Sequence, residues 1–219
     1  STKIFGNTIY KKYLSSNYTN LTFEKKVFFS SNNQYVNSFI NYKETLNSDL
    51  IEVHNRPNYI KIIKKKYQNK LFLYFHNDPL QMSGSKTIKE RLDLINTVDR
   101  IIFNSEWSKG RFFIDLDNKQ DLIKKTSVCF QSSSKVKINF KKKENIISFV
   151  GKLNRAKGYD LFGNAIIKIL NKYTDWKSNV YGDEPREKHI FKHKNLKIFG
   201  FKNNEYILND LKKTSISVI

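Results

Sequence analysis

The residues best suited to chemistry lie in one short stretch, 151–158, which reads GKLNRAKG. Three cations, Lys152, Arg155 and Lys157, fall between two glycines there. An apolar run at 146–150 precedes the stretch, and a helical pattern of apolar residues follows it. Lysines beside the N–H groups of a helix N-terminus suit a doubly charged phosphate. An ordinary strand-to-helix connection with solvated lysines gives the same pattern, and the stretch alone does not decide between them.

A second group of polar residues follows the predicted strands of the first half. Ligands of open α/β sheets bind outside the carboxyl ends of the strands, so these residues are candidates for a site. The imidazole of His76 can donate or accept a hydrogen bond there. The alternative for His76 and His54 is a structural role in the turns that precede Pro79 and Pro57. The group comprises His54, Asn55, Arg56, His76, Asn77, Asp78, Asn104, Ser105 and Glu106.

Strand and helix patterns alternate regularly along the chain, which predicts an open α/β sheet in each half. The polar stretch 118–144, with a weak strand at 128–130, is predicted to link a domain at 1–143 to a domain at 144–219. The predicted strands are 25–30, 49–53, 70–75, 100–103, 146–150, 178–181, 196–199 and 215–219. The predicted helices are 9–14, 34–45, 59–68, 88–96, 107–113, 159–173 and 204–213.

Composition sets limits on the class of protein. The 219 residues carry a formal charge of +20, which suggests anionic partners: nucleic acid, a membrane surface or phosphorylated ligands. The lysines are spread along the chain, and no zinc finger or aromatic RNA-binding pattern is present. A single cysteine, Cys129, excludes a disulfide framework and suits a reducing compartment. His189 and His193 lack the glutamate of a zincin motif, so we expect no metal site.

The stretch 149–160 resembles the opening of the nucleotide-sugar domain in retaining family 4 glycosyltransferases of GT-B fold. Their motif is commonly written Gly-Arg-Leu-x-x-x-Lys-Gly, and its Arg and Lys bind the diphosphate of the donor. Lys152 and Lys157 occupy those positions here. The residues for which the resemblance implies donor binding are Gly151, Lys152, Asn154, Arg155, Lys157, Gly182, Asp183 and Phe201.

Other segments follow in the order of the family. The segment 74–79 is similar to the one whose histidine lies near the transferred sugar, which implies that His76 is the catalytic residue. The segment 52–57 resembles one found in lipopolysaccharide- and capsule-type members, and 100–107 resembles the strand that precedes their interdomain region. These two imply that His54, Asn55, Arg56, Ser105 and Glu106 lie toward the acceptor or between the domains. The segments 180–183 and 198–201 resemble further parts of the donor site.

The chain also departs from the family pattern. Lys152 replaces an arginine and keeps the charge without the bidentate fork. Glu184 stands where glycine is frequent, and the glycine-rich loop of the first domain is reduced to Gly6-Asn7. The Glu-x7-Glu segment of the family would lie beyond Ile219. We therefore expect a fragment or a shortened product.

The resemblance implies two Rossmann-like open-sheet lobes, the C-terminal lobe incomplete. It implies transfer of a sugar from a nucleotide-diphosphate donor to a glycan or lipid-linked acceptor, with retention, in lipopolysaccharide or other cell-surface polysaccharide biosynthesis. No cofactor or metal is expected, and the nucleotide sugar is a substrate. We expect a cytoplasmic protein with peripheral contact to the anionic inner membrane face and no nucleic-acid partner. The alternatives are a non-catalytic truncated GT-B remnant and a basic nucleic-acid-binding α/β protein.

Overall fold

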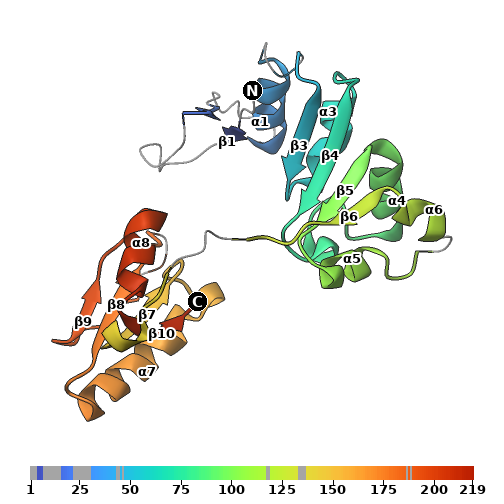
Figure 1. The fold of residues 1–219 in the computed structure, drawn as a ribbon. Helices are drawn as coiled ribbons and strands as arrows, with labels where there is room; N and C mark the ends of the chain where they lie inside the picture. Colours follow the sequence, from blue (N-terminus) through green and yellow to red (C-terminus); the bar gives the residue numbers. More distant parts are fainter. Residues whose placement is uncertain are drawn as a thin grey trace. The chain divides into compact units, whose positions relative to one another are not determined.

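Two compact units make up the chain, Ser1–Ser133 and Ser134–Ile219. The computed structural model describes residues 4–6, 16–21, 31–42, 45, 47–116, 119–132, 137–185, 187 and 189–219 (Figure 1). The predicted helix at 9–14, the predicted strand at 25–30 and Asn7 lie outside the described residues. Each unit is built around its own sheet, as the alternating pattern predicts.

Unit 1 contains a four-stranded parallel sheet in the order β3-β4-β5-β6. Its strands are β3 (Leu50–His54), β4 (Lys70–Phe75), β5 (Arg100–Phe103) and β6 (Thr126–Val128). A separate parallel pair is formed by β1 (Ile4–Gly6) and β2 (Tyr18–Asn20). The α-helices are α1 (Ser31–Ile40), α3 (Ile60–Lys64), α4 (Ile88–Thr97), α5 (Glu106–Phe112) and α6 (Lys119–Ile123). Two 3-10 turns complete it, η2 (Pro57–Tyr59) and η3 (Pro79–Gln81).

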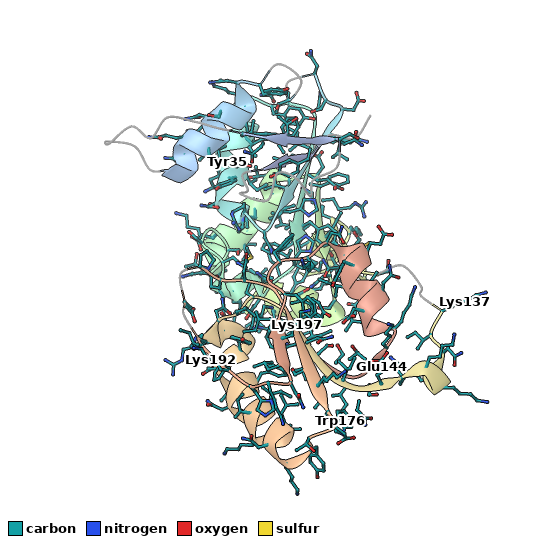
Figure 2. All side chains as sticks on the ribbon, turned by 90° about the vertical axis from the view of Figure 1, so that its left-hand side faces the viewer. Tyr35, Lys137, Glu144, Trp176, Lys192 and Lys197 are labelled. Atoms are coloured by element: carbon teal, nitrogen blue, oxygen red, sulfur yellow. The ribbon has the colours of Figure 1, made fainter. Side chains whose placement is uncertain are left out.

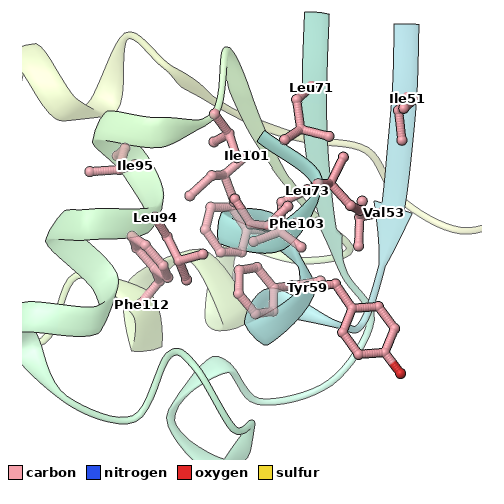
Figure 3. Packing of buried hydrophobic residues seen from close by; sticks show 14 of the residues in the cluster. Ile51, Val53, Tyr59, Leu71, Leu73, Leu94, Ile95, Ile101, Phe103 and Phe112 are labelled. Carbon is pink, nitrogen blue, oxygen red and sulfur yellow. The ribbon is translucent and has the colours of Figure 1, made fainter. Parts of the chain in front are cut away.

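The core of unit 1 gathers around β4, the strand with the longest apolar run. Leu71, Leu73 and Phe75 are fully buried on one face, while Phe72 and Tyr74 on the other face are half-buried. Figure 3 shows Leu73 and Phe103 of the sheet beside Leu94 and Phe112 of the helices. Each such side chain contributes about 1.5–3 kcal/mol on burial. This packing fixes where β4 and its neighbours end.

Three predicted elements in the described part of unit 1 differ from the structure by more than one residue. The helix predicted at 34–45 begins and ends earlier, as α1 at Ser31–Ile40. The helix predicted at 59–68 is shorter, because η2 occupies 57–59 and α3 ends at Lys64. The strand predicted at 128–130 begins earlier, since buried Thr126 is the register partner of Ile101 in β5. Residues 126 and 127 carry hydroxyl groups, so this strand does not form the apolar run by which a strand is recognised in the sequence.

Unit 2 contains a four-stranded parallel sheet in the order β10-β7-β8-β9. Its strands are β7 (Glu144–Val150), β8 (Lys177–Tyr181), β9 (Leu196–Ile198) and β10 (Thr214–Val218). Its helices are η4 (Phe140–Lys142), η5 (Arg155–Lys157), α7 (Tyr159–Lys172) and α8 (Asn204–Leu211). The chain steps outward from β7 to β9 and then returns to the other side of β7. The strand order therefore reverses at β7, the position where open α/β sheets bind ligands.

Helix α7 packs on β7 through one side. Phe162, Ile166 and Leu170 recur every four residues and are buried, together with Phe149 of β7. This contact fixes the start of α7 relative to the end of β7, and thereby fixes the loop between them. The fold as a whole confirms two Rossmann-like α/β lobes. Among the described residues, no helix has the length and apolar character needed to cross a membrane.

Gly182 permits the close approach of the loops after β7 and β8. Its φ is +137°, and a Cβ at this position would lie 1.8 Å from the carbonyl oxygen of Gly151. Gly158 also has a positive φ, of +68°, but a Cβ there would meet nothing within 4 Å. We expect Gly182→Ala to lower the free energy of unfolding by more than about 3 kcal/mol and Gly158→Ala by about 1 kcal/mol. Urea unfolding measures both, and equal losses would contradict the close approach.

Candidate functional site

The loop after β7 is shaped by its own side chains. Gly151 continues the sheet by donating its N–H to the carbonyl of Tyr181 at 3.0 Å. The side chain of Asn154 then accepts from the backbone N–H of Lys157 at 3.1 Å, which caps η5. Gly158 adopts the left-handed conformation and starts α7. The side-chain oxygen of Asn154 thus has a structural role, because it accepts the hydrogen bond that caps the turn.

The three cations of the loop differ in their surroundings. Arg155 lies 3.5 Å from Asp160 in an ion pair, with its side chain 80% exposed. Lys152 and Lys157 are exposed, and neither side chain forms a hydrogen bond or an ion pair with another described residue. Both therefore remain available to an anion at the point where the strand order reverses. The cationic loop predicted from the sequence is present at the predicted place.

A carboxylate from a distant part of unit 2 reaches this loop. Glu187 accepts the backbone N–H of Arg155 at 3.0 Å, through Oε2. The same carboxylate lies 3.1 Å from Nε2 of His189. An anion, the Glu187 carboxylate, thus already accepts the backbone N–H of Arg155, the first residue of η5. Sequence reasoning missed Glu187, because the segment that carries it has no periodic pattern.

A cavity of about 360 Å³ opens beside the loop, bounded by the residues that follow β7, β8 and β9. Its walls combine apolar side chains, such as Leu153 and Ile198, with carboxylates, of which Glu184 is buried. Gly182 and Asp183 line it, and Gly200 lines it where the neighbouring Phe201 does not; a role of these residues in donor binding stays a prediction. The complete lining is Leu153, Gly182, Asp183, Glu184, Pro185, Glu187, His189, Ile190, Ile198 and Gly200.

In unit 1, two histidines meet at the carboxyl edge of the sheet. His54 ends β3 and His76 follows β4, and their rings are nearly parallel, at 16°, with centroids 5.1 Å apart. His54 Nδ1 lies 2.8 Å from His76 Nε2, within hydrogen-bond distance. The ring of Tyr74 stacks on both, at 4.4 Å from His76 and 5.3 Å from His54. The sequence identified both histidines as candidate site residues but did not predict that they contact each other.

The backbone around His76 is held from two neighbouring strands. Its N–H donates to Oδ1 of Asn55 at 2.8 Å, and its carbonyl accepts from Nδ2 of Asn104 at 2.8 Å. Asn55 itself adopts a left-handed conformation, with φ of 54°. Asn104 comes directly after β5, a position that the strand-end rule flags in the sequence. Asn55 and Asn104 therefore fix the position of His76.

The pKa of His76 is lowered from its ordinary value, first by burial and then by the neighbouring His54. A lowered pKa keeps the imidazole neutral at physiological pH, because the value for a free histidine is about 6.5. A neutral ring offers one donor and one acceptor. At the edge of the unit 1 sheet, His76 thus acts as a hydrogen-bonding group without a charge.

The remaining predicted residues of unit 1 are occupied mainly by local structure. Arg56 donates to the carbonyl of Asn55 at 2.8 Å and is otherwise exposed. The hydroxyl of Ser105 accepts from the N–H of Ser108 at 3.2 Å and caps α5, whose first turn contains Glu106. A role for these three residues toward an acceptor or between domains stays a prediction. Within the described part of the chain, no group of three or more potential metal ligands is found.

The lysines of unit 2 do not form one stripe. Figure 2 shows Lys137 and Lys192 pointing away from opposite sides of the unit. A nucleic-acid-binding protein usually concentrates its charge on one face. The spread of lysines therefore does not favour the alternative of a nucleic-acid-binding protein.

The comparisons with solved structures agree with the fold. TarM from S. aureus, solved with UDP and α-GlcNAc-glycerol, has a TM-score of 0.59 at 13% identity, over 84% of this chain and 40% of its own. The S. aureus MnaA–UDP complex has a TM-score of 0.58 at 11% identity, and the match covers 93% of this chain and 60% of MnaA. The pneumococcal O-GlcNAc transferase GtfA, solved with UDP and GlcNAc, has a TM-score of 0.55 at 11% identity. The match covers 86% of this chain and 40% of GtfA.

These neighbours share the GT-B fold, and their complexes contain UDP. The chain spans about 40 to 60% of their length. The sequence matches no protein-family model and no curated protein sequence. The likeness thus establishes the fold.

Asp78 ties the segment after His76 to α5. Its carboxylate accepts from Arg111 at 3.0 Å, and this hydrogen bond lowers the pKa of Asp78 below its ordinary value. The stability that it contributes is present above the pKa of an unfolded aspartate, about 3.9, and is lost as the pH falls through the lowered native value. We expect Asp78→Asn to be less stable than wild type at pH 7 and to lose less stability between pH 5 and pH 2. Urea unfolding across this range tests it, and parallel losses would contradict it.

Proposed function

We propose that the loop after β7 binds the diphosphate of a nucleotide sugar and that the chain belongs to a glycosyltransferase. The observation that carries the proposal is the pair Lys152 and Lys157. Both side chains are exposed, lack ionic partners among the described residues and lie at the reversal of strand order. The carboxylate of Glu187 at the N–H of Arg155 supports it, because this carboxylate marks a place where an anion is accepted.

The cationic loop suits the chemistry of glycosyl transfer. Cleavage of the bond between sugar and diphosphate leaves negative charge on the departing phosphate, and fixed cations stabilise that charge as it develops. Lys152 and Lys157 would supply this stabilisation, the task that a metal ion performs in other enzymes. We therefore propose that transfer needs no metal.

The cavity beside the loop suits the nucleoside. Its apolar walls, including Leu153 and Ile198, can cover a base, while Asp183 and Glu184 are acceptors suited to ribose hydroxyls. Carboxylates would repel phosphate, so a nucleotide would place its diphosphate toward the lysines and its nucleoside toward the acidic wall.

His76 is the residue proposed to contact the transferred sugar. It is neutral and held by Asn55 and Asn104, so it can bind a hydroxyl with a defined orientation. We propose transfer with retention, without a covalent intermediate on the protein, to a glycan or lipid-linked acceptor. This would place the chain in cell-surface polysaccharide biosynthesis, in the cytoplasm. The charge of +20 would favour peripheral contact with an anionic membrane.

Removal of Lys157 tests the diphosphate site. A charge-assisted contact is worth about 1.5–3 kcal/mol, so Lys157→Ala should weaken UDP binding by about 10- to 100-fold. Lys168→Ala, an exposed lysine further along α7, is the matched control and should leave the affinity unchanged. Calorimetry measures the affinities. Stabilisation of the chain by oligonucleotides but not by UDP would overturn the proposal.

Glu187 provides a test in the opposite direction. A bound diphosphate that uses the N–H of Arg155 must displace the Glu187 carboxylate, at a cost of about 1 kcal/mol for the lost hydrogen bond. We expect Glu187→Gln to bind UDP about fivefold more tightly than wild type. Glu205→Gln, an exposed position of α8, makes the same change in charge and should have a smaller effect. Weaker binding to Glu187→Gln would show that the loop holds no anion beside Arg155.

A further inference from the structure

Both ring nitrogens of His76 are occupied. Nε2 lies 2.8 Å from Nδ1 of His54, and Nδ1 lies 2.7 Å from the side-chain nitrogen of Gln131. On the far side of His54, Nε2 lies 3.5 Å from Oε2 of Glu52. Four side chains, from β3, from the residue after β4 and from the segment after β6, thus form one continuous chain of contacts.

The chemistry of Gln131 fixes the direction of these hydrogen bonds. An amide nitrogen only donates, so Nδ1 of His76 accepts. A neutral imidazole that accepts at Nδ1 carries its proton at Nε2, which therefore donates to Nδ1 of His54. His54 then carries its own proton at Nε2, facing the carboxylate of Glu52. The donors at Gln131 and at Nε2 of His76 each meet an acceptor within hydrogen-bond distance, and Nε2 of His54 lies 3.5 Å from the Glu52 carboxylate.

We propose that His54 is a positioning residue that holds His76 as a hydrogen-bond acceptor through Nδ1, and that a ligand hydroxyl replaces Gln131 at that nitrogen. The identification of the hydroxyl with a sugar rests on the proposed function. The hydrogen-bond order between His54 and His76 stands independently of it.

The two partners of His76 differ in how firmly they are held. His54 belongs to β3, pairs with Tyr74 of β4 in the sheet and stacks on its ring. Gln131 is exposed and lies beyond the end of β6, two residues after Cys129 makes the last backbone contact with β5. Displacing Gln131 costs one exposed hydrogen bond, whereas displacing His54 disrupts the strand edge. Gln131 is therefore the partner that a ligand replaces.

This arrangement determines what His76 can recognise. An acceptor nitrogen on a neutral ring binds a group that donates a hydrogen bond and gives no attraction to a phosphate. Without His54, Nε2 could lose its proton to Nδ1, and the ligand-facing nitrogen would become a donor. His54 thereby selects a hydroxyl over an anion at this edge of the sheet.

Nitrogen-15 NMR of the histidine rings in the full chain tests the positioning role directly. We expect the Nε2 proton of His76 to exchange slowly with water in the wild type. His54→Phe keeps an aromatic ring but removes the acceptor, so the protection should be lost. His54→Asn supplies an oxygen near the position of Nδ1 and should restore it. A proton on Nδ1 of His76, or equal exchange in all three proteins, would overturn the proposal.

Binding of UDP-glucose and UDP to the same proteins tests the ligand. We expect UDP-glucose to shift the Nδ1 resonance of His76, and its advantage over UDP to fall about tenfold in His54→Phe. Gln131→Ala should increase that advantage. If UDP binds but UDP-glucose leaves the Nδ1 resonance unchanged, replacement of Gln131 by a sugar hydroxyl is wrong. If neither nucleotide binds, the proposed function fails, and the proton exchange still decides the role of His54.

The dependence on pH provides a readout that a purely structural role would not change. The titratable groups in contact with His76 are His54 of β3 and Tyr74 of β4. One contact further away, Glu52 lies beside His54, and the Tyr74 hydroxyl donates to the backbone carbonyl of Cys129. Protonated His76 cannot accept a hydrogen bond, so the advantage of UDP-glucose should disappear as the pH falls through the lowered pKa of His76. In His54→Asn one cause of the lowering is removed, and the loss should begin at a higher pH. An unchanged profile would contradict the proposal.

Discussion

Parallel pairing of strands is the constraint on which both candidate sites depend. All strands of one parallel sheet end at the same edge, so residues far apart in the sequence meet there. In unit 1 this brings His54 to His76 although they are separated by a helix and a turn. In unit 2 the return of β10 to the side of β7 places the cationic loop at the reversal of strand order.

The two edges carry opposite chemistry. The loop of unit 2 offers exposed lysines without ionic partners among the described residues, whereas the edge of unit 1 offers a neutral imidazole in an ordered hydrogen-bond chain. The close contact of Gly182 with Gly151 and the packing of α7 on β7 hold the charged edge in shape. Asn55 and Asn104 do the same for the neutral edge.

Local patterns in the sequence were enough to predict most of the framework. The apolar run of β4, the periodic apolar residues of α7 and the GKLNRAKG loop are local features, and each lies where it was predicted. The contact of His54 with His76 depends on the register of β3 and β4, which no local pattern encodes. Glu187 reaches Arg155 from an irregular segment, and β6 begins with hydroxyl residues, so neither gave a periodic signal.

Binding of a nucleoside diphosphate by the loop after β7 is the proposal on which the other functional assignments depend. A titration of UDP into the nitrogen-15-labelled chain, followed through the backbone amide resonances, tests it most directly. We expect the largest shifts at Gly151, Lys157 and Gly158, with a second group at Gly182 and Asp183 beside the cavity. Shifts confined to other parts of the chain, or no saturable shifts with UDP, would contradict it.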